Sequence, residues 1–314
     1  MKQLGLGILL WSQATSWPEF ESAARKVDRL GYDHIWTWDH LYAIFGDPYQ
    51  PIFEGWTAIT GLARVTSRVR LGLMVGANTF RNPGLVAKMA TTLDHVTGGR
   101  AILGLGGAWH QSEHSAHGIE FGQSSGERLD WLDEAAGAVR RLLDGETVDH
   151  VGAHYSFNGL RQAPSPIQRH LPIVIGGSGE RKTLLTVAKY ADMWNAFGTV
   201  DVLRHKAQVL TAHCEDIGRD PGEIEFSVAC KPVIRDTEEE ALAVWHGLME
   251  ANRTPMAQVA DDPSFWVGKP EQIAEKMTAF QEAGFQTVIA EMAAPYDHET
   301  LERLIGEVRP MVTV

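Results

Sequence analysis

The chain has 314 residues, of which 44% are hydrophobic and 22% are charged, so it can bury a full core without disulfides or a structural metal. Acidic residues outnumber basic ones by 40 to 28, whereas proteins that bind nucleic acid or anionic membranes usually have a basic excess. This composition argues against disordered and fibrous proteins, and against nucleic acid or a membrane as a partner.

The N-terminal residues contain one short apolar run, at positions 4–10, which is too short to span a membrane. A secretory signal would need a longer apolar region and a small-residue cleavage site, so the run is interpreted as the first buried strand. The two cysteines, Cys214 and Cys230, match no metal-binding spacing and no disulfide framework. We therefore expect a reduced, cytoplasmic setting.

Short continuous apolar runs, typical of strands buried in a parallel sheet, recur along the chain. They lie at residues 4–10, 34–38, 69–75, 101–105, 172–175, 191–196, 225–234 and 287–291. Helical periodicity fills most of the intervals, at residues 18–30, 83–96, 126–143, 178–190, 200–217, 270–283 and 297–308. Several of these stretches begin with proline and are followed by glycine, as helix ends commonly are.

This alternation, with no linker rich in proline or serine, predicts an α/β fold: a single (β/α)8 TIM barrel over residues 1–314. A doubly wound parallel sheet is the alternative. Two excursions interrupt the pattern. Residues 147–170 are predicted to contain a hairpin, and residues 236–268 an acidic helix. With the shorter loop at 42–51, these segments are expected at the strand C-terminal face, where long excursions often form lids or interfaces.

In barrel enzymes the chemistry takes place where strands end, so the residues just after each strand are the candidates. The second strand ends in Trp38-Asp39-His40. A histidine there can give or take a proton near neutral pH, and Asp39 could orient it. The alternative is an aspartate that caps the next element beside a solvated histidine.

Small residues follow the third, fourth and fifth strands. Residues 76–78 would let a flat ligand approach the backbone, although an ordinary turn capped by Asn82 explains them too. Residues 104–109 lack the dinucleotide-binding fingerprint, but they offer backbone donors suited to an anionic or flat ligand. Residues 176–179 precede a predicted helix, whose free N–H groups would favour phosphate. A plain glycine-rich turn with a serine cap is the alternative.

Residues 110–114 read His-Gln-Ser-Glu-His, a pattern found on zinc-binding helices. The pattern follows directly on a glycine turn, and no third ligand is identifiable, so no metal site is expected. Trp11, Trp38 and Trp109 fall at strand ends, where a flat conjugated ligand could stack on them.

Six segments read WDHL (38–41), MVGANTFRNP (74–83), LDHVTGGR (93–100), LGLGGAWH (103–110), PIVIGGSG (172–179) and YADMWN (190–195). In this order they resemble the luciferase-like monooxygenase superfamily, and more closely its branch of oxidoreductases dependent on the deazaflavin coenzyme F420. The sugar-phosphate dehydrogenase of that family has a glutamate where Trp109 stands here. This difference argues against that substrate, and against a carboxylate acid at this position.

The resemblance implies a (β/α)8 barrel that binds a flavin or deazaflavin at the strand C-termini. The segment near Met74 and Val75 would back the cofactor ring, often through a bulge with a non-proline cis peptide, and His40 would lie near the reactive ring carbon. The cofactor tail would run along the glycine turn after the fourth strand, with its phosphate held by the turn after the fifth. The implied cofactor-binding residues are Asp39, Met74, Val75, Gly76, Asn78, Gly106, Gly107, Ala108, Trp109, Gly176, Gly177, Ser178 and Gly179.

The expected function is that of an F420-dependent oxidoreductase, which transfers hydride between the cofactor and a small organic substrate, with His40 as the catalytic proton partner. One alternative is an FMN-dependent monooxygenase that uses O2 and takes reduced FMN from a partner reductase. Another is a catalytically silent barrel that binds F420 or a regulator. A homodimer is the expected assembly, and an F420 or FMN reductase is a possible cofactor supplier.

Overall fold

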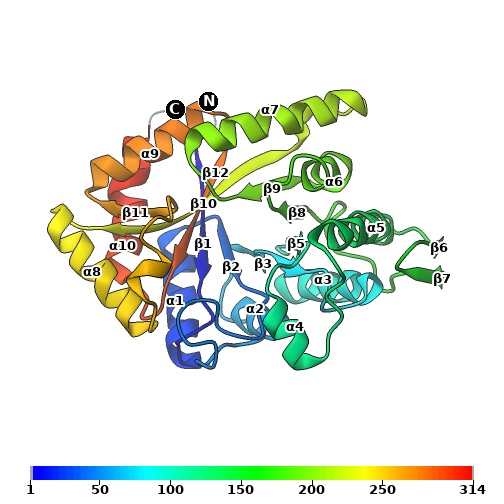
Figure 1. Cartoon of the computed structure of the whole chain (residues 1–314), viewed down its shortest axis with the longest axis horizontal. Helices are drawn as coiled ribbons and strands as arrows, with labels where there is room; N and C mark the ends of the chain where they lie inside the picture. Colours follow the sequence, from blue (N-terminus) through cyan, green and yellow to red (C-terminus); the bar gives the residue numbers. More distant parts are fainter. Residues whose placement is uncertain (1–2, 313–314) are drawn as a thin grey trace. The chain divides into compact units, whose positions relative to one another are not determined.

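The computed structural model describes residues 3–312, which form two compact units (Figure 1). Unit 1 consists of the N-terminal segment up to Val69, the short segment Ala196–His205 and the C-terminal segment from Phe226. Unit 2 consists of Arg70–Asn195 and Lys206–Glu225. Each unit is built around parallel strands that are connected by helices.

The core of unit 1 is a parallel sheet in the order β2-β1-β12-β10, with β11 paired in parallel to β10. Its strands are β1 (Gly5–Leu10), β2 (His34–Thr37), β10 (Glu225–Ile234), β11 (Phe265–Gly268) and β12 (Thr287–Met292). Side chains such as Leu6, Ile8 and Val288 are fully buried. The strands therefore read as apolar runs, because both of their faces are covered.

The helices of unit 1 begin and end where local chemistry dictates. They are α1 (Trp17–Leu30), α2 (Gly55–Ala63), α8 (Glu238–Ala251), α9 (Pro270–Glu282), α10 (His298–Arg303) and α11 (Arg309–Met311), with a π-helical turn at Leu304–Val308 and a 3-10 turn at Met256–Gln258. Before α1, the backbone N–H and the hydroxyl of Ser16 both donate to Glu19 Oε2, at 3.1 and 2.7 Å. Gly31, with φ of 89°, ends that helix in the left-handed conformation that glycine favours.

Unit 2 has a parallel sheet in the order β9-β8-β5-β4. Its strands are β3 (Arg70–Leu73), β4 (Gly76–Ala77), β5 (Leu103–Gly106), β8 (Ile173–Gly176) and β9 (Met193–Ala196). The helices are α3 (Pro83–Thr97), α4 (Gln111–His117), α5 (Ser125–Leu143), α6 (Thr183–Tyr190) and α7 (Val200–Asp216), the last of which starts in unit 1, with a 3-10 turn at Pro221–Glu223. A parallel bridge joins Leu71 to Ala101 and sets β3 beside the start of β5.

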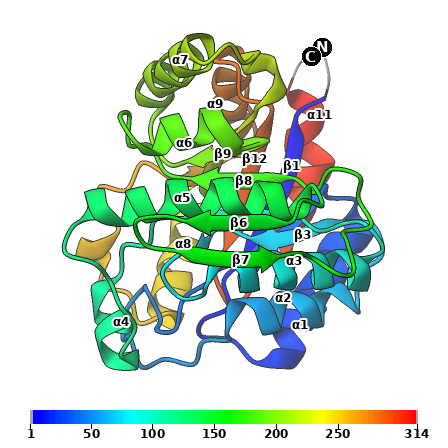
Figure 2. The same ribbon diagram turned by 90° about the vertical axis from the view of Figure 1, so that its right-hand side faces the viewer.

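The excursion at 147–170 contains the predicted hairpin, formed by β6 (Val148–Val151) and β7 (Ser156–Leu160). Figure 2 shows it alongside α5. Glu134 of α5 accepts hydrogen bonds from the backbone N–H groups of His154 and Tyr155, at 3.1 and 2.8 Å, and from the His150 ring at 2.8 Å. These bonds lower the pKa of Glu134, although burial acts in the opposite direction. A charged carboxylate therefore fixes the hairpin turn to the helix.

All eight predicted strands and the predicted acidic helix, α8, are present, with three corrections. The third strand is divided into β3 and β4 by the segment Met74–Val75. The helix expected from residue 178 starts at Thr183, because residues 180–182 form a turn. Helices α2 and α4 and strand β11 were not predicted. Helix α2 is short, and its cap is Glu54, an unusual N-cap that accepts from Trp56 N and Thr57 N. Over residues 3–312, no helix has both the length and the apolar character that a membrane span requires.

Asp28 connects α1 to the segment that precedes β3. It is 7% exposed, and its carboxylate accepts four hydrogen bonds. The donors are the backbone N–H groups of Ser67, Arg68 and Val69, at 2.9–3.0 Å, and the Ser67 hydroxyl at 3.1 Å. Burial alone would raise the pKa of Asp28, but these bonds outweigh it and lower the pKa. The ionised carboxylate thus contributes to the stability of unit 1.

We predict that Asp28→Asn lowers the free energy of unfolding at pH 7 by about 2–4 kcal/mol, because the amide NH2 faces N–H donors that lose their acceptor. Urea denaturation measures the loss, and Asp261→Asn in an exposed loop is the control. Because the folded-state pKa is depressed, the contribution of Asp28 is complete above the unfolded pKa, about 3.9, and disappears as the pH falls through the folded value. A difference between wild type and variant that stays constant from pH 7 to pH 3 would contradict this role.

Candidate functional site

Val75 lies against two glycines at the strand ends of unit 2. Gly76 pairs with Leu105, and Leu105 pairs with Ile175, so the ends of β4, β5 and β8 converge. A Cβ atom on Gly106 would come within 2.6 Å of Val75 Cγ2, and one on Gly176 within 2.9 Å of the same atom. Neither position accepts a side chain unless Val75 moves. Val75, Gly106 and Gly176 therefore pack closely together, and we call this group the glycine wall.

The peptide bond between Met74 and Val75 is cis, as the resemblance implied. Met74 is 8% exposed, so this segment is largely enclosed. The backbone N–H of Asn78, just after β4, donates to Gly106 O at 3.0 Å. The segment from Met74 to Asn78 is thus held against β5 by main-chain contacts, and its shape does not depend on mobile side chains.

The Asn78 side chain joins β4 to the hairpin. It is 2% exposed, and its Nδ2 donates to Tyr155 Oη at 3.0 Å. Burial raises the pKa of Tyr155 to about 12, so the phenol is neutral at physiological pH. Tyr155 was not predicted, because no local pattern indicates that residue 155 reaches residue 78. The amide group of Asn78, a predicted cofactor-binding residue, is therefore already hydrogen-bonded to another side chain of the same chain.

The turn after β5 combines backbone freedom with an exposed ring. Gly107 follows the strand, and Ala108 has φ of 57° in the left-handed region. Trp109 is 62% exposed, with its ring centroid 5.0 Å from that of His110. A tryptophan so exposed beside a glycine turn offers a face on which a flat group can stack.

The histidine pattern at 110–114 forms the start of α4. His114 Nε2 lies 2.6 Å from the Thr79 hydroxyl, and its Nδ1 lies 2.8 Å from His110 O. Its ring packs against Phe80 and Phe121, at centroid distances of 4.7 and 4.5 Å. Burial lowers the pKa of His114, which favours the neutral ring. Both ring nitrogens are engaged by protein groups, so this histidine attaches α4 to the loop after β4.

The turn after β8 has two backbone donors that are unpaired within residues 3–312. Gly177 has φ of 125°, its N–H donates to Asn195 O at 2.9 Å, and its carbonyl accepts from Trp194 Nε1 at 2.7 Å. Within the described part of the chain, the backbone N–H groups of Ser178 and Gly179 have no hydrogen-bond partner. Gly177 is thus fixed in place, and the next two donors remain available for an anionic group.

These donors belong to a loop and not to a helix N-terminus, because α6 begins only at Thr183. This corrects the prediction that the helix dipole contributes directly. Lys182 is also committed elsewhere, since its Nζ donates to both carboxylate oxygens of Asp130 at 2.7 Å. Arg181 is exposed and makes no ion pair or hydrogen bond within residues 3–312, so its charge is available at this loop.

In unit 1, Asp39 and His40 follow β2, as predicted. Asp39 is 2% exposed, and a Cβ atom on Gly55 would lie 2.5 Å from Trp38 O and 3.1 Å from Asp39 Cα. The start of α2 therefore packs directly on this backbone. His40 is half-buried, and its ring meets Trp38 edge-on with centroids 6.4 Å apart. The close contact with α2 fixes the backbone that positions the His40 ring.

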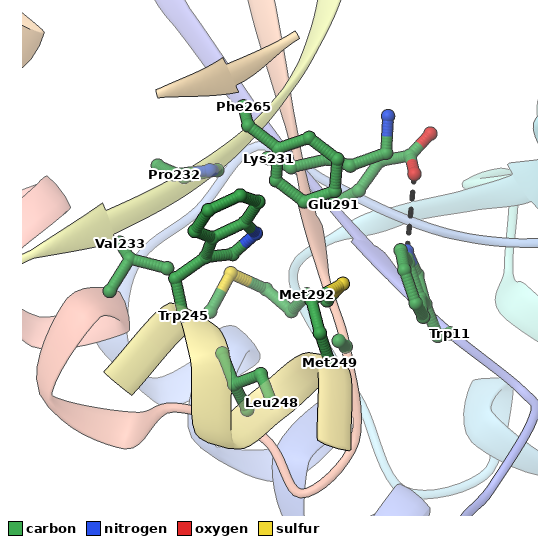
Figure 3. A pocket seen from close by; sticks show the side chains of 11 residues that line it. Trp11, Lys231, Pro232, Val233, Trp245, Leu248, Met249, Phe265, Glu291 and Met292 are labelled. Atoms are coloured by element: carbon green, nitrogen blue, oxygen red, sulfur yellow. Dashed lines mark hydrogen bonds between the residues drawn. The ribbon is translucent and has the colours of Figure 1, made fainter. Parts of the chain in front are cut away.

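Two buried charged residues of unit 1 were not predicted. Glu291 on β12 is 4% exposed, and its Oε2 accepts a hydrogen bond from Trp11 Nε1 at 3.1 Å (Figure 3). Lys231 on β10 is 7% exposed, and its Nζ donates to Ser264 Oγ at 2.6 Å and Asp262 Oδ2 at 3.2 Å. The signal in the sequence was a charged residue within one apolar run and at the end of the other, which is unusual in a buried strand.

Aromatic rings surround these two charges. The Lys231 ammonium lies 5.0 Å from the ring centroids of Phe197 and Phe265 and 5.9 Å from that of Phe45. Phe45 in turn stacks on Trp11, with centroids 4.4 Å apart and planes 6° from parallel. A small cavity borders the group; its lining residues are Trp11, Lys231, Pro232, Val233, Trp245, Leu248, Met249, Phe265, Glu291, Met292 and Ala293 (Figure 3). Because this lining is mostly apolar, burial is the dominant effect on Glu291 and raises its pKa.

Comparison with known proteins relates this arrangement to one family. An uncharacterized protein of Mycobacterium tuberculosis (strain ATCC 25618 / H37Rv) is 32% identical over 148 residues, 47% of this chain and 51% of that protein. Pyrimidine monooxygenase RutA of Stutzerimonas stutzeri (strain A1501) is 29% identical over 238 residues, 73% of this chain and 64% of that protein. The matches thus span about half to two thirds of these curated relatives.

A solved F420-dependent secondary alcohol dehydrogenase, in complex with an F420–acetone adduct, superposes with a TM-score of 0.84 at 19% identity, over 100% of both chains. At this identity the likeness shows the fold, and it confirms the predicted (β/α)8 barrel. The family model of the luciferase-like monooxygenases matches residues 7–287. The chain therefore belongs to the luciferase-like monooxygenase family.

Proposed function

We propose that this protein is an F420-dependent oxidoreductase that transfers hydride between the deazaflavin and a small organic substrate. The observation behind the proposal is the glycine wall of unit 2, where the Val75 side chain fills the space that side chains on Gly106 and Gly176 would need. The likeness to an F420-dependent alcohol dehydrogenase over the whole of both chains supports the same cofactor. When bound, a deazaflavin supplies or accepts two electrons as hydride, and it reacts poorly with oxygen.

The residues of unit 2 fit such a cofactor. A planar ring needs a flat backing, which the glycine wall offers, and Trp109 offers an exposed ring face beside the turn at 106–108. A phosphate needs N–H donors. The backbone N–H groups of Ser178 and Gly179 can supply them, because they are unpaired within residues 3–312. The proposed contacts are therefore Val75 and Gly106 for the ring and the turn at 176–179 for the phosphate.

In unit 1, His40 is proposed as the proton partner of hydride transfer. It lies at the end of β2, where barrel enzymes place catalytic groups, and α2 fixes its backbone. Its half-buried ring remains open to exchange protons with solvent. Asp39 stands next to it and is enclosed, so it is proposed to orient the site and not to exchange protons itself.

An FMN-dependent monooxygenase is the second candidate. The similarity to pyrimidine monooxygenase RutA over 73% of this chain favours it. That activity would need O2 and a source of reduced FMN, proposed to be a separate reductase. The same residues would hold FMN, because the flat backing and the phosphate donors suit either ring system.

The first prediction concerns cofactor choice. Fluorescence titration of the purified chain with F420 and with FMN, side by side, is expected to show tighter binding of F420. Tight binding of FMN with weak binding of F420 would reverse the order of the two candidates. If neither bound, the glycine wall would have no cofactor role and only the fold would stand.

The second prediction tests the glycine wall. Gly106→Ala places a methyl group 2.6 Å from Val75 Cγ2, so Val75, which is proposed to back the ring, must move. We expect the Kd for the cofactor to rise about 10-fold or more, which corresponds to a loss of about 1.4 kcal/mol. Gly247→Ala in α8, where an added Cβ meets open space, is the control. Unchanged cofactor affinity in a folded Gly106→Ala variant would contradict the assignment.

The third prediction concerns His40. With the cofactor bound, His40→Ala is expected to lower kcat by about 10²- to 10⁴-fold, the usual contribution of a general acid or base. The Kd for the cofactor should change little, because the proposed ring and phosphate contacts lie elsewhere. The control is His205→Ala, at an exposed position of α7. Wild-type turnover by a cofactor-loaded His40→Ala variant would show that His40 is not the proton partner.

A further inference from the structure

One side chain of the β6–β7 hairpin, Tyr155, reaches the segment that carries Val75. The Tyr155 hydroxyl accepts from Asn78 Nδ2 at 3.0 Å, and within residues 3–312 it has no other hydrogen-bond partner. The backbone N–H of Asn78 in turn donates to Gly106 O at 3.0 Å. Asn78 therefore links the hairpin to the main chain that the proposed function places behind the cofactor ring. All of these residues belong to unit 2.

Helix α5 fixes the turn that carries Tyr155. The Glu134 side chain is 13% exposed and accepts from the backbone N–H groups of His154 and Tyr155 and from the His150 ring. The His154 ring stacks on Trp131, with centroids 3.8 Å apart and planes 8° from parallel. The Tyr155 backbone cannot leave α5 without breaking these contacts, so a helix sets the direction of its side chain.

The other strand of the hairpin lies against the start of α3. A Cβ atom on Gly84 would come within 2.7 Å of Leu160 Cδ2 and within 3.6 Å of Phe157 Cε1. Strand β7 therefore packs directly on the first turn of that helix (Figure 2). Gln162 Nε2, just after the strand, donates to Gly84 O at 3.4 Å. The hairpin thus contacts the chain both at Asn78 and at the beginning of α3.

The Asn78 amide depends on the Tyr155 hydroxyl. Asn78 is 2% exposed, so its side chain cannot turn to solvent for another partner. A buried N–H group that loses its acceptor is costly, and the segment would have to shift until the group finds a new one. The Asn78 backbone is bonded to Gly106 O, and Val75 is wedged against Gly106. A shift at Asn78 would therefore disturb the glycine wall.

We propose that Tyr155 is a positioning residue, which holds Asn78 and through it keeps Val75 in the place that backs the cofactor ring. This inference rests on the proposed function, because it needs a flat cofactor ring at the glycine wall. Tyr155 itself takes no part in the chemistry. It keeps the ring at the distance and angle that hydride transfer requires, and a misplacement of about 1 Å can lower a rate about 10²-fold.

The first test uses the cofactor-free chain. Tyr155→Phe removes the hydroxyl and keeps the ring, and we expect hydrogen exchange of the Asn78 backbone amide to become about 10-fold faster, because the segment opens more often. The matched control is Tyr190→Phe. Tyr190 is a half-buried tyrosine of α6 in the same unit, and its hydroxyl has no hydrogen bond within residues 3–312. Unchanged exchange at Asn78 in a folded Tyr155→Phe variant would overturn the proposal.

The second test uses the protein saturated with F420 and a panel of enones, nitro compounds and alcohols. For the substrate that wild type turns over best, we expect kcat of Tyr155→Phe to fall about 10- to 10²-fold and KM to change less than about threefold. The visible circular dichroism of the bound cofactor should change as well, because it depends on how the ring lies against the protein. Wild-type kcat with an unchanged spectrum would show that Tyr155 is only structural and would overturn the proposal.

A double-mutant cycle tests whether the effect passes through Asn78. Asn78→Ala removes the same hydrogen bond from the other side, so adding Tyr155→Phe to it should lower kcat by less than about twofold more. Effects that multiply in the double variant would overturn the proposed route.

The pH profile distinguishes positioning from proton exchange. Burial, with smaller effects of Glu134 and Glu120, raises the pKa of Tyr155 to about 12, whereas the Asn78 hydrogen bond acts in the opposite direction. The phenol therefore stays neutral, and the ratio of wild-type to Tyr155→Phe kcat should be constant from pH 7.5 to 9. A ratio that varies over this range would make Tyr155 a proton-exchanging group and overturn the positioning role.

These tests separate the inference from the proposed function. If wild type bound FMN and not F420, the F420 assignment would fail, and the same spectra and rates with FMN would test Tyr155. If wild type bound neither cofactor, both proposals would fail, whatever the exchange at Asn78. If wild type were active with F420 and Tyr155→Phe matched it, the role of Tyr155 would fail and the proposed function would stand.

Discussion

Backbone must approach backbone closely where parallel strands end, and this constraint determines the character of the strand ends in unit 2. Val75 occupies the space that side chains on Gly106 and Gly176 would need. Gly104 is even more restricted, since a Cβ atom there would overlap the carbonyl of Leu73. Three glycines are thus required by packing alone. The same close packing places Val75 where the proposed function puts the backing of a flat cofactor ring, so one constraint serves both the fold and the proposed function.

Two buried carboxyl groups of unit 1 show how the number of hydrogen-bond donors sets the charge of an acid. Asp28 receives four hydrogen bonds, which outweigh its burial and lower its pKa. Among residues 3–312, Glu291 receives one and has no direct counter-ion, so burial prevails and raises its pKa. The first group is suited to hold a segment in place as a fixed anion. The second keeps its proton to a higher pH than an exposed glutamate does.

The groups at the strand ends divide into those that are exposed or have unpaired donors and those that hydrogen bonds within the chain already use. Trp109 is largely exposed, and Ser178 and Gly179 keep unpaired backbone donors within the described chain. The Asn78 amide is bonded to Tyr155, and His114 is bonded through both ring nitrogens. The polar side chains that hold the hairpin and α4 therefore lie next to the turns proposed to bind the ligand. These side chains hold the neighbouring turns in place, and a preorganised binding site requires such supporting residues.

Much of the architecture follows from patterns along the chain. The buried strands are apolar runs, and proline and glycine mark several helix ends, so strand order, helix positions and the strand-end segments at 38–40, 104–109 and 176–179 were predictable. Helix α2 was not, because nine residues carry too little periodicity to stand out, and β11 was not, because it lies inside the segment interpreted as an excursion. The late start of α6 was also missed, since the turn at 180–182 has no distinctive composition.

The sequence by itself determined the fold class and the strand ends at which the candidate residues lie, because burial on both faces and tight turns impose residue types that can be read locally. Only the tertiary structure decided which polar groups meet. Trp11 and Glu291 are 280 residues apart, and Asn78 and Tyr155 are 77 apart. Whether a glutamate on a buried strand is an anion or an acid depends on how many donors and charges surround it in space. Those donors and charges come from segments that are distant in the sequence, so no local pattern predicts them.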